Sequence, residues 1–280
     1  MNKLQSLSDQ LDTVLEQEGR VWLNHARQQL EELDDDMELV ANQLAIFSAS
    51  AKRKAGLSAL SGEIASGFSQ DAYDQCGKVY LQYWSSADAV RVLLLAETIA
   101  SGMFSADELF QLCYRYSDGG ERASLLKGLA LMDLTVNSTD YIIDVARTNS
   151  LALFSALIYK NPWPVVNFPL PAFNQVVLKS LFMGINIFNV EGLRGARNPE
   201  LGRMSADYAQ ERLDAGRDIP ESIWLAVDAS IMSEAGLTAW ESALASDPQQ
   251  PRCQLALLGC QWQLALPANL QRAAKVHGSF

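Results

Sequence analysis

Apolar residues recur at spacings of three and four along most of the chain, which is the pattern of helices with one buried face. Alternation of apolar and polar positions, which marks half-buried strands, is nearly absent. The sequence therefore predicts an all-α protein. Near the N-terminus we expect helices over Val21–Leu33 and from Asp35 to Phe47, after a first helix that buries Leu4, Leu7, Leu11, Val14 and Leu15.

A change of composition after these helices suggests a boundary. Ala51–Phe68 contains Lys52-Arg53-Lys54 and three glycines, and it reads as a loosely structured connection. We therefore expect residues 1–70 to form an N-terminal helical hairpin with its connection. Residues 71–280 then form the main all-helical domain.

Helical segments follow one another closely in this main domain, with starts roughly 12 to 18 residues apart. One of them begins at Ser105-Ala106-Asp107-Glu108, which has the form of a capping box. This rhythm is typical of antiparallel helix pairs stacked side by side, as in HEAT-like α-solenoid arrays. Because the residues show no repeat of fixed period, a compact irregular helical bundle stays open as the alternative.

A proline-rich segment, Lys160–Pro171, interrupts the helices. Prolines push the residues before them towards extended geometry, so the sequence predicts a non-helical crossing here. The segment is apolar, which is unusual for a surface loop, and we expect it to be buried. Helices should resume at Phe173–Met183 and again at Asn198-Pro199, where Asn caps a helix and Pro occupies its first turn.

The charge balance narrows the class of partner. With 22 Lys and Arg against 33 Asp and Glu the net charge is −11, which would repel polyanions, so we expect no nucleic-acid partner. The two charge-free stretches, 161–178 and 253–271, are interrupted by proline and glutamine, and no transmembrane segment is expected. The first residues run into helix-like sequence without an apolar signal segment, which predicts a cytoplasmic protein.

Few residues are suited to metal or nucleophilic chemistry. The four cysteines include no C-x-x-C pair, and we expect reduced, buried thiols at Cys76, Cys113, Cys253 and Cys260. His25 and His277 lie near opposite ends, too isolated in the sequence to indicate a metal cluster or a Ser–His–Asp triad. The segment 34–38 matches the D-D-x-x-E form of magnesium–diphosphate sites but lacks a second metal-binding helix, so we interpret it as a solvated helix start. The sequence thus predicts no metal and no cofactor.

The stretch from Arg147 to Trp224 resembles the EboA family of helical proteins linked with metabolite traffic. Weaker similarity extends upstream to about Arg91 and downstream through Ala243–Gly259, and residues 1–70 carry little of it. The resemblance is carried by the order and number of its segments: Arg147-Thr148-Asn149, Asn161-Pro162-Trp163-Pro164, Asn167-Phe168, 173–179, Leu181-Phe182, Gly192-Leu193, 197–201, Asp207-Tyr208-Ala209, Glu211-Arg212, Ala215-Gly216-Arg217 and Ile223-Trp224.

This resemblance implies a functional context and no catalytic residue. Members accompany a membrane prenyltransferase-like protein, a metal-dependent hydrolase-like protein and sugar-phosphate-type enzymes. Their implied role is to help a secondary metabolite or its precursor reach the cell envelope. The expected partners are therefore proteins of that pathway, including the prenyltransferase-like protein, and a small apolar metabolite. Through such partners the protein would lie at the inner face of the membrane.

The matching block contains the residues most suited to binding. Along the helix from Asn198 the charged residues can be read in three ways: as a solvated surface with i,i+4 pairs, as a buried network that fixes the proline segment, or as the lining of a groove. That network would comprise Arg197, Asp207, Tyr208, Glu211 and Arg212. Lys179 is placed to neutralise an anionic ligand, or to extend from the core edge. Trp163 and Phe168 are suited to stacking on a flat metabolite, or to filling the core.

The candidate ligand- or partner-binding residues are Arg147, Asn161, Trp163, Asn167, Phe168, Asn174, Lys179, Arg197, Asn198, Asp207, Tyr208, Glu211 and Arg212. The first hypothesis is a non-enzymatic adaptor or small-molecule-binding protein. The second is an enzyme acting on the same precursor, with Asp207 or Glu211 as acid or base. The third is a structural subunit whose proline segment docks on a partner.

Overall fold

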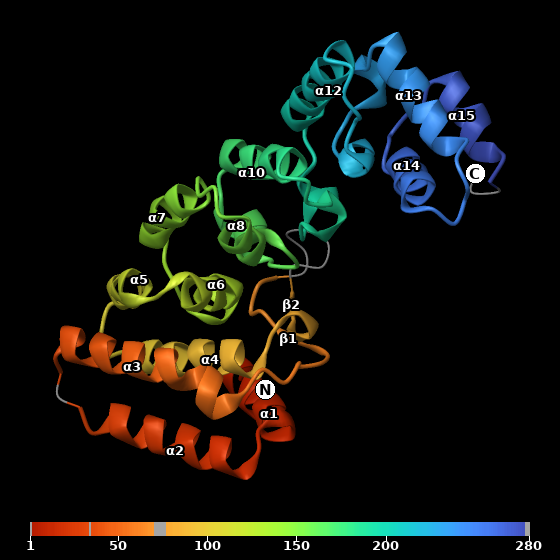
Figure 1. Ribbon diagram of the computed structural model, residues 1–280. Coiled ribbons are helices and arrows are strands. Elements are labelled where there is room, and N and C mark those ends of the chain that lie inside the picture. The colour runs from red at the N-terminus through yellow and green to blue at the C-terminus, as the bar shows by residue number, and fades with distance from the viewer. Residues whose placement is uncertain (1, 34, 70–76, 278–280) are drawn as a thin grey trace. The chain divides into compact units, whose positions relative to one another are not determined.

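Helices dominate the part of the chain that the structure describes, as the apolar spacing predicts (Figure 1). The computed structural model describes residues 2–33, 35–69 and 77–277. The expected boundary at residue 70, Asp34 of the D-D-x-x-E segment and Cys76 lie outside these ranges. The chain forms two compact units, Met1–Phe168 (unit 1) and Pro169–Phe280 (unit 2).

In the described part of unit 1, three α-helices are followed by a buried fourth α-helix and by five shorter ones. Its α-helices are α1 (Lys3–Val14), α2 (Gln17–Glu31), α3 (Met37–Ala55), α4 (Ser86–Ala100), α5 (Ala106–Tyr116), α6 (Gly119–Lys127), α7 (Asn137–Val145), α8 (Leu151–Ile158) and α9 (Trp163–Asn167). Short 3-10 turns cover Leu81–Tyr83 and Leu129–Leu131.

The core of unit 1 is built around α4. This helix is buried on nearly every side, as its almost continuous apolar sequence from Ala89 to Ala96 requires. It contacts α1, α3 and α6, while α2 packs on α3 and α6 packs on α8 (Figure 1). Neighbouring helices therefore share one continuous core. The HEAT-like array stays a prediction.

A small sheet replaces part of the connection expected over Ala51–Phe68. Here α3 continues to Ala55, because Lys52, Arg53 and Lys54 suit the negative end of a helix, and Gly56 at φ 76° ends it. Strand β1 (Glu63–Ala65) then pairs antiparallel with β2 (Lys78–Tyr80). Strands of three residues are too short to give a periodic signal in the sequence.

The proline segment differs in part from its prediction. Its part up to Phe168 is largely buried, as expected, whereas Pro169, Leu170 and Pro171 are exposed and begin α10 (Leu170–Phe182). The segment is also not wholly extended, because Trp163–Asn167 forms the short helix α9. Pro164 lies in the first turn of α9, where a missing N–H breaks no helical hydrogen bond. Trp163 is 1% exposed and packs edge-on against Phe168, with ring centroids 5.7 Å apart. Residues 161–168 of the segment are thus part of the core of unit 1.

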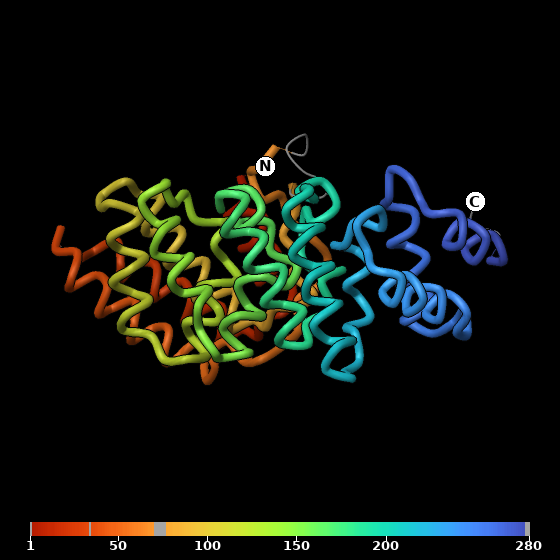
Figure 2. Tube along the Cα trace, turned by 90° about the horizontal axis from the view of Figure 1, so that it is seen from above, coloured from red at the N-terminus to blue at the C-terminus, as the bar shows by residue number. Residues whose placement is uncertain are grey.

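Unit 2 comprises α10 (Leu170–Phe182), α11 (Leu193–Ala196), α12 (Pro199–Asp214), α13 (Glu234–Leu244), α14 (Pro251–Gln261) and α15 (Ala268–Lys275). As predicted, Asn198 caps α12, its side chain accepting from the Leu201 amide at 3.0 Å, and Pro199 opens the helix. The last three helices pack on one another, as the blue end of the tube in Figure 2 shows. Their core includes Trp224, from the 3-10 turn Glu221–Leu225, stacked on Trp240 at 5.0 Å.

Candidate functional site

The charged residues of α12 form a solvated surface, so the interpretation as a buried network is wrong. Asp207 and Glu211 are exposed, and Arg203 pairs with Glu200 at 2.7 Å and with Asp207 at 2.6 Å. The reason is the phase of the helix. The buried positions are Leu201, Gly202, Ser205 and Ala209, which leaves the charged residues on the opposite side. Tyr208 and Arg212 lie between these two faces and are partly exposed.

The candidate residues around the proline segment hold that segment in place. The buried side chain of Asn161 donates to the Leu126 carbonyl at 2.9 Å and accepts from the Trp163 amide at 3.1 Å. Asn167 donates to the Trp163 carbonyl at 3.0 Å, which closes the turn of α9. These contacts explain the Asn-Pro-Trp-Pro and Asn-Phe pieces of the sequence as packing signals. Their role as ligand contacts stays a prediction.

The remaining candidates are divided between surface and interior. Arg147 is exposed and lies 3.2 Å from Asp144. Asn174 is buried and exchanges amide hydrogen bonds with Asn198, at 2.9 and 3.2 Å, which ties α10 to the start of α12. Lys179 is partly buried, and burial lowers its pKa because the charged form loses hydration.

Two of the predicted residues, Arg197 and Asn198, lie at a pocket in unit 2. The pocket has a volume of about 510 Å³ and is enclosed by three stretches of chain. These are the junction of α11 with α12, the segment 226–230 and the loop between α14 and α15. The last supplies Trp262, Gln263 and Leu264, and the Leu264 side chain is fully exposed.

The charged residues in the wall of this pocket are Arg194, Asp228 and the half-buried Arg197. The Arg197 guanidinium donates to the carbonyls of Val227, at 2.9 Å, and of Trp262. Burial lowers the pKa of Arg197, and the nearby Asp228 carboxylate opposes that effect. Among the described residues no carboxylate forms an ion pair with Arg197, and its Nε is buried without a hydrogen-bond partner. The site therefore holds a half-buried positive charge without a counter-charge in direct contact.

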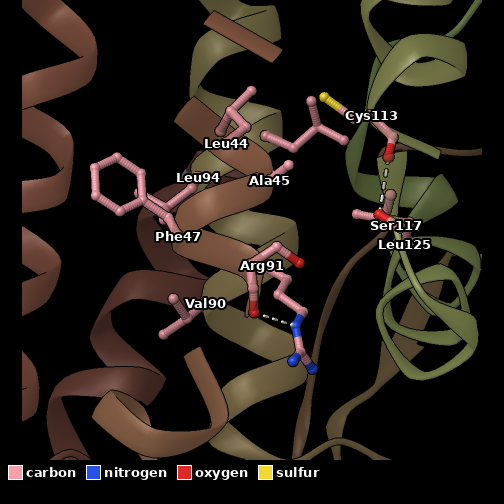
Figure 3. Close-up of a pocket in the computed structure, with 11 residues that line it drawn as sticks. Leu44, Ala45, Phe47, Val90, Arg91, Leu94, Cys113, Ser117 and Leu125 are labelled. Carbon is pink, nitrogen blue, oxygen red and sulfur yellow. Dashed lines mark hydrogen bonds between the residues drawn. The ribbon is translucent and has the colours of Figure 1, made fainter. Parts of the chain in front are cut away.

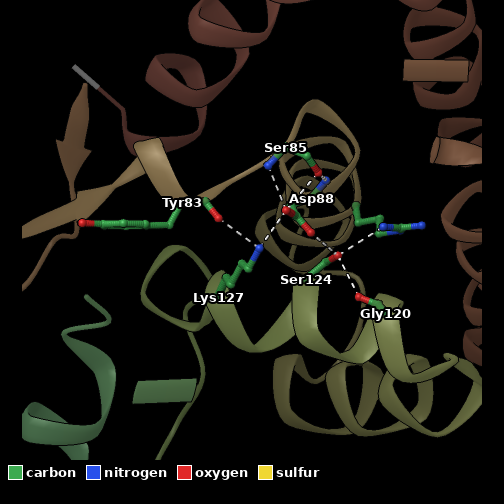
Figure 4. Close-up of polar contacts among 7 residues, drawn as sticks. Tyr83, Ser85, Asp88, Gly120, Ser124 and Lys127 are labelled. Carbon is green, nitrogen blue, oxygen red and sulfur yellow. Dashed lines mark hydrogen bonds and ion pairs between the residues drawn. The ribbon is translucent and has the colours of Figure 1, made fainter. Parts of the chain in front are cut away.

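Sequence reasoning missed a buried polar cluster in unit 1 (Figure 4). The carboxylate of Asp88 accepts from Ser124 at 2.6 Å, from Lys127 at 2.8 Å and from the amide and hydroxyl of Ser85 at 2.8 and 2.9 Å. Ser124 is completely buried, so no substrate can reach its hydroxyl. The cluster resembles a Ser–Lys–Asp arrangement by composition, but it joins α4 to α6. The spacing Ser85-x-x-Asp88 before an apolar run was the available signal, and it predicts only a cap.

A second missed carboxylate, Asp107, joins α5 to the start of α7. It accepts from the Thr135 amide at 2.9 Å, from the Thr135 hydroxyl and from the Ser138 hydroxyl at 2.5 Å. Burial raises the pKa of Asp107, but these hydrogen bonds outweigh it, so the net pKa lies below the usual value. The sequence indicated Asp107 only as a member of a helix cap.

The thiols offer no reactive nucleophile among the described residues. Burial raises the pKa of Cys113 and of Cys260 to about 12, and it also raises that of Cys253. All three are unpaired and buried, as predicted. The described residues also contain no group of three or more His, Cys, Asp or Glu side chains able to hold a metal ion.

A small cavity lies in unit 1 between α3, α4 and α5 (Figure 3). Its volume is about 20 Å³, enough for about one water molecule. Arg91 at its edge donates to the Ser48 carbonyl at 3.1 Å and to the Ser124 hydroxyl at 3.2 Å. This cavity is too small for a metabolite, whereas the unit 2 pocket has room for one.

Comparison with known proteins gives a match to a protein family. No curated protein and no solved structure matches the chain. Within the described ranges no helix is both long and apolar enough to cross a membrane. A family model described as metabolite traffic protein EboA matches residues 3–228. The match includes the N-terminal helices, where the sequence showed little similarity, and ends before Ala243–Gly259. With most of its length covered, the chain belongs to the EboA family of metabolite traffic proteins.

Proposed function

We propose that this protein binds a metabolite with an apolar body and an anionic group in the pocket of unit 2. The observation that supports this proposal is Arg197, a half-buried guanidinium in a pocket wall without an ion-pair partner among the described residues. A buried charge of this kind is costly unless something neutralises it. A carboxylate, sulfonate or phosphate group on a ligand would do so.

The rest of the lining suits the other end of such a ligand. A volume of about 510 Å³ falls within the range of small-molecule sites, roughly 300–1,000 Å³. Trp262 and Leu264 supply apolar surface at the rim, while Asn198 and Ser230 supply polar groups that could orient the ligand. Asp228 limits the net positive charge of the pocket, which favours a ligand with a single anionic group.

We propose that the protein contributes to metabolite traffic by binding the metabolite without catalysing a reaction. The protein would hold the metabolite in the cytoplasm and present it to pathway proteins at the inner face of the membrane, among them the prenyltransferase-like protein. A HEAT-like stacking of helix pairs would supply the scaffold. Asp207 and Glu211, the acid or base of the enzymatic alternative, are exposed and do not line the pocket, so we assign them no reaction.

An anionic fluorescent dye tests this proposal directly. Anilinonaphthalene sulfonate has an aromatic body and one sulfonate, and its neutral relative N-phenylnaphthylamine lacks the anion. We expect the sulfonate dye to bind the wild type and to bind Arg197→Gln about tenfold or more weakly, since a hydrogen bond to a charged group contributes about 1.5–3 kcal/mol. The neutral dye should not distinguish the two proteins.

Two further variants separate binding from folding. Arg203→Gln removes a guanidinium of α12 that lies outside the pocket, and it should leave dye affinity unchanged. Leu264→Asp changes a fully exposed side chain at the rim, so it should weaken both dyes without lowering stability. Equal affinity of the sulfonate dye for wild type, Arg197→Gln and Leu264→Asp would refute the proposal. If the dyes bind as expected, mass spectrometry of small molecules that co-purify with the wild type and not with Arg197→Gln would identify the natural ligand.

A further inference from the structure

A second concave surface lies in unit 1, far in sequence from Arg197. It is a groove of about 250 Å³ lined by residues of α2, α3 and α4 and of the turn that leads to α5. Met103 in that turn is 48% exposed, and Phe104 beside it is partly exposed. The apolar side chains that line the groove are Leu30, Val40, Leu94, Met103 and Phe104.

The one basic side chain of the lining is already neutralised. Arg27 forms two hydrogen bonds with the Glu97 carboxylate, at 2.9 and 2.7 Å, and a third with Ser8 at 2.9 Å. Glu31 also lines the groove and is exposed. No described basic group pairs with Glu31, so its charge adds a negative potential to the groove.

Acidic residues dominate the chain around this groove. Between residues 28 and 51 there is no Lys or Arg, while Glu32, Asp35 and Glu38 are exposed there. Most of the net negative charge of the whole protein also lies on unit 1. Unit 2 contains nine basic and eleven acidic residues, a net charge of −2, which leaves −9 of the total −11 on unit 1.

We propose that this groove docks a basic segment of a partner protein, with an apolar side chain in the groove and Lys or Arg residues beside Glu31. The volume is below the usual range of small-molecule sites but suits one or two inserted side chains. Methionine at the rim can adapt its shape to such an anchor. The negative surroundings select a positively charged segment and accelerate its encounter with the groove.

A labelled amphipathic peptide of Leu and Lys, spaced for a helix, is the probe, and a matched Leu and Glu peptide is its control. Fluorescence anisotropy should show binding of the Lys peptide that weakens as salt is raised, and no binding of the Glu peptide. We expect Met103→Ala and Glu31→Lys each to weaken binding about fivefold or more. Lysine near the C-terminal end of α2 is compatible with the helix, so Glu31→Lys should fold normally.

Matched controls change the same kinds of residue outside the groove. Val136→Ala removes an 80% exposed apolar side chain, and Asp12→Lys reverses an exposed charge on α1. Both should stay within about twofold of the wild-type affinity. Equal weakening by controls and groove variants would overturn the proposal, as would binding of the Glu peptide. A loss with Met103→Ala but not with Glu31→Lys would exclude a basic partner. A dimer in sedimentation velocity that Met103→Ala dissociates would assign the groove to a second copy of this chain instead.

Discussion

The contact between Lys127 and Asp88 offers a sharp test of how unit 1 is held together. The two side chains lie 2.8 Å apart, with 26% and 13% of their surfaces exposed. Lys127 also donates to the Tyr83 carbonyl at 3.1 Å, so it links α6 to the turn before α4 (Figure 4). The substitution Lys127→Met keeps an unbranched apolar stem, one atom shorter than that of lysine, and removes the charge and the donors of the ammonium group.

The expected loss in the free energy of unfolding depends on the partners that Asp88 keeps in Lys127→Met. Removing one partner of a buried ion pair costs about 3–5 kcal/mol, because the other charge is left without compensation. Asp88 keeps its hydrogen bonds from Ser124 and Ser85, and Lys127 is partly hydrated. We therefore expect a loss near the lower end, about 3 kcal/mol. The matched control is Lys54→Met, whose partner Glu18 lies 3.2 Å away on the surface, and it should cost less than about 1 kcal/mol.

Urea titration followed by circular dichroism measures both losses. With slopes of about 1–3 kcal/mol per molar urea, a loss of 3 kcal/mol moves the midpoint by about 1–3 M. Hydrogen exchange, resolved by peptide, should show faster exchange in α4 and α6 for Lys127→Met and no change there for Lys54→Met. If the two substitutions cost the same, the reasoning from burial is refuted.

The same cluster predicts a direction for the pH dependence of stability. Burial raises the pKa of Asp88, but the Lys127 charge and the hydrogen bonds from Lys127, Ser124 and Ser85 outweigh it, so the net pKa is lowered. A lowered pKa in the folded state stabilises the protein above the unfolded value of about 3.9, and this stability is lost as the pH falls through the folded value. The free energy of unfolding should therefore fall below about pH 4 in the wild type, and less steeply in Lys127→Met.

Three other outcomes are expected. In the same urea titration, Trp163→Ala should lower the free energy of unfolding by about 3–5 kcal/mol. Phe182→Ala, at a side chain that is 78% exposed, should lower it by less than about 0.5 kcal/mol. Equal losses would show that Trp163 is not part of the core. Gly259→Ala places a methyl group 2.7 Å from the Trp224 carbonyl oxygen, so it should lower the melting temperature and change the near-ultraviolet dichroism of the tryptophans. Iodoacetamide at pH 8 should modify Cys113 and Cys260 only after urea is added, because their thiols are buried and have pKa values of about 12. Rapid labelling of the folded protein would contradict their burial.

Local signals predicted the helices and several of their ends correctly. The Asn198-Pro199 start of α12 is one example, because an N-cap and a first-turn proline act through the backbone of their own helix. The burial of Trp163 was also predictable, since an apolar loop can only be stable when it is covered. The prediction that the proline segment is non-helical was wrong. Proline is compatible with a first helical turn, and α9 uses that property.

Contacts between distant residues could not be predicted in the same way. Asp88 and Asp107 both read as helix caps, but each also binds a second helix that is distant in the sequence. On α12 the sequence allowed either face to be buried, and the packing of Leu201, Ser205 and Ala209 decided that Asp207 faces water. Arg197 was among the candidates, but its pocket depends on Trp262, a residue 65 positions away.

The pocket of unit 2 is lined by two parts of the chain, one inside the span that matches the family and one outside it. Arg197, Asn198 and Asp228 fall inside the span that matches the family, while Ser230 and the residues from Trp262 to Ala265 fall beyond it. The charged residues Arg197 and Asp228 thus lie in the family span, and the apolar residues Trp262 and Leu264 lie outside it. In the proposed binding mode, substitutions confined to the loop between α14 and α15 would change the selectivity for the apolar part of the ligand and leave the Arg197 contact with its anionic group intact.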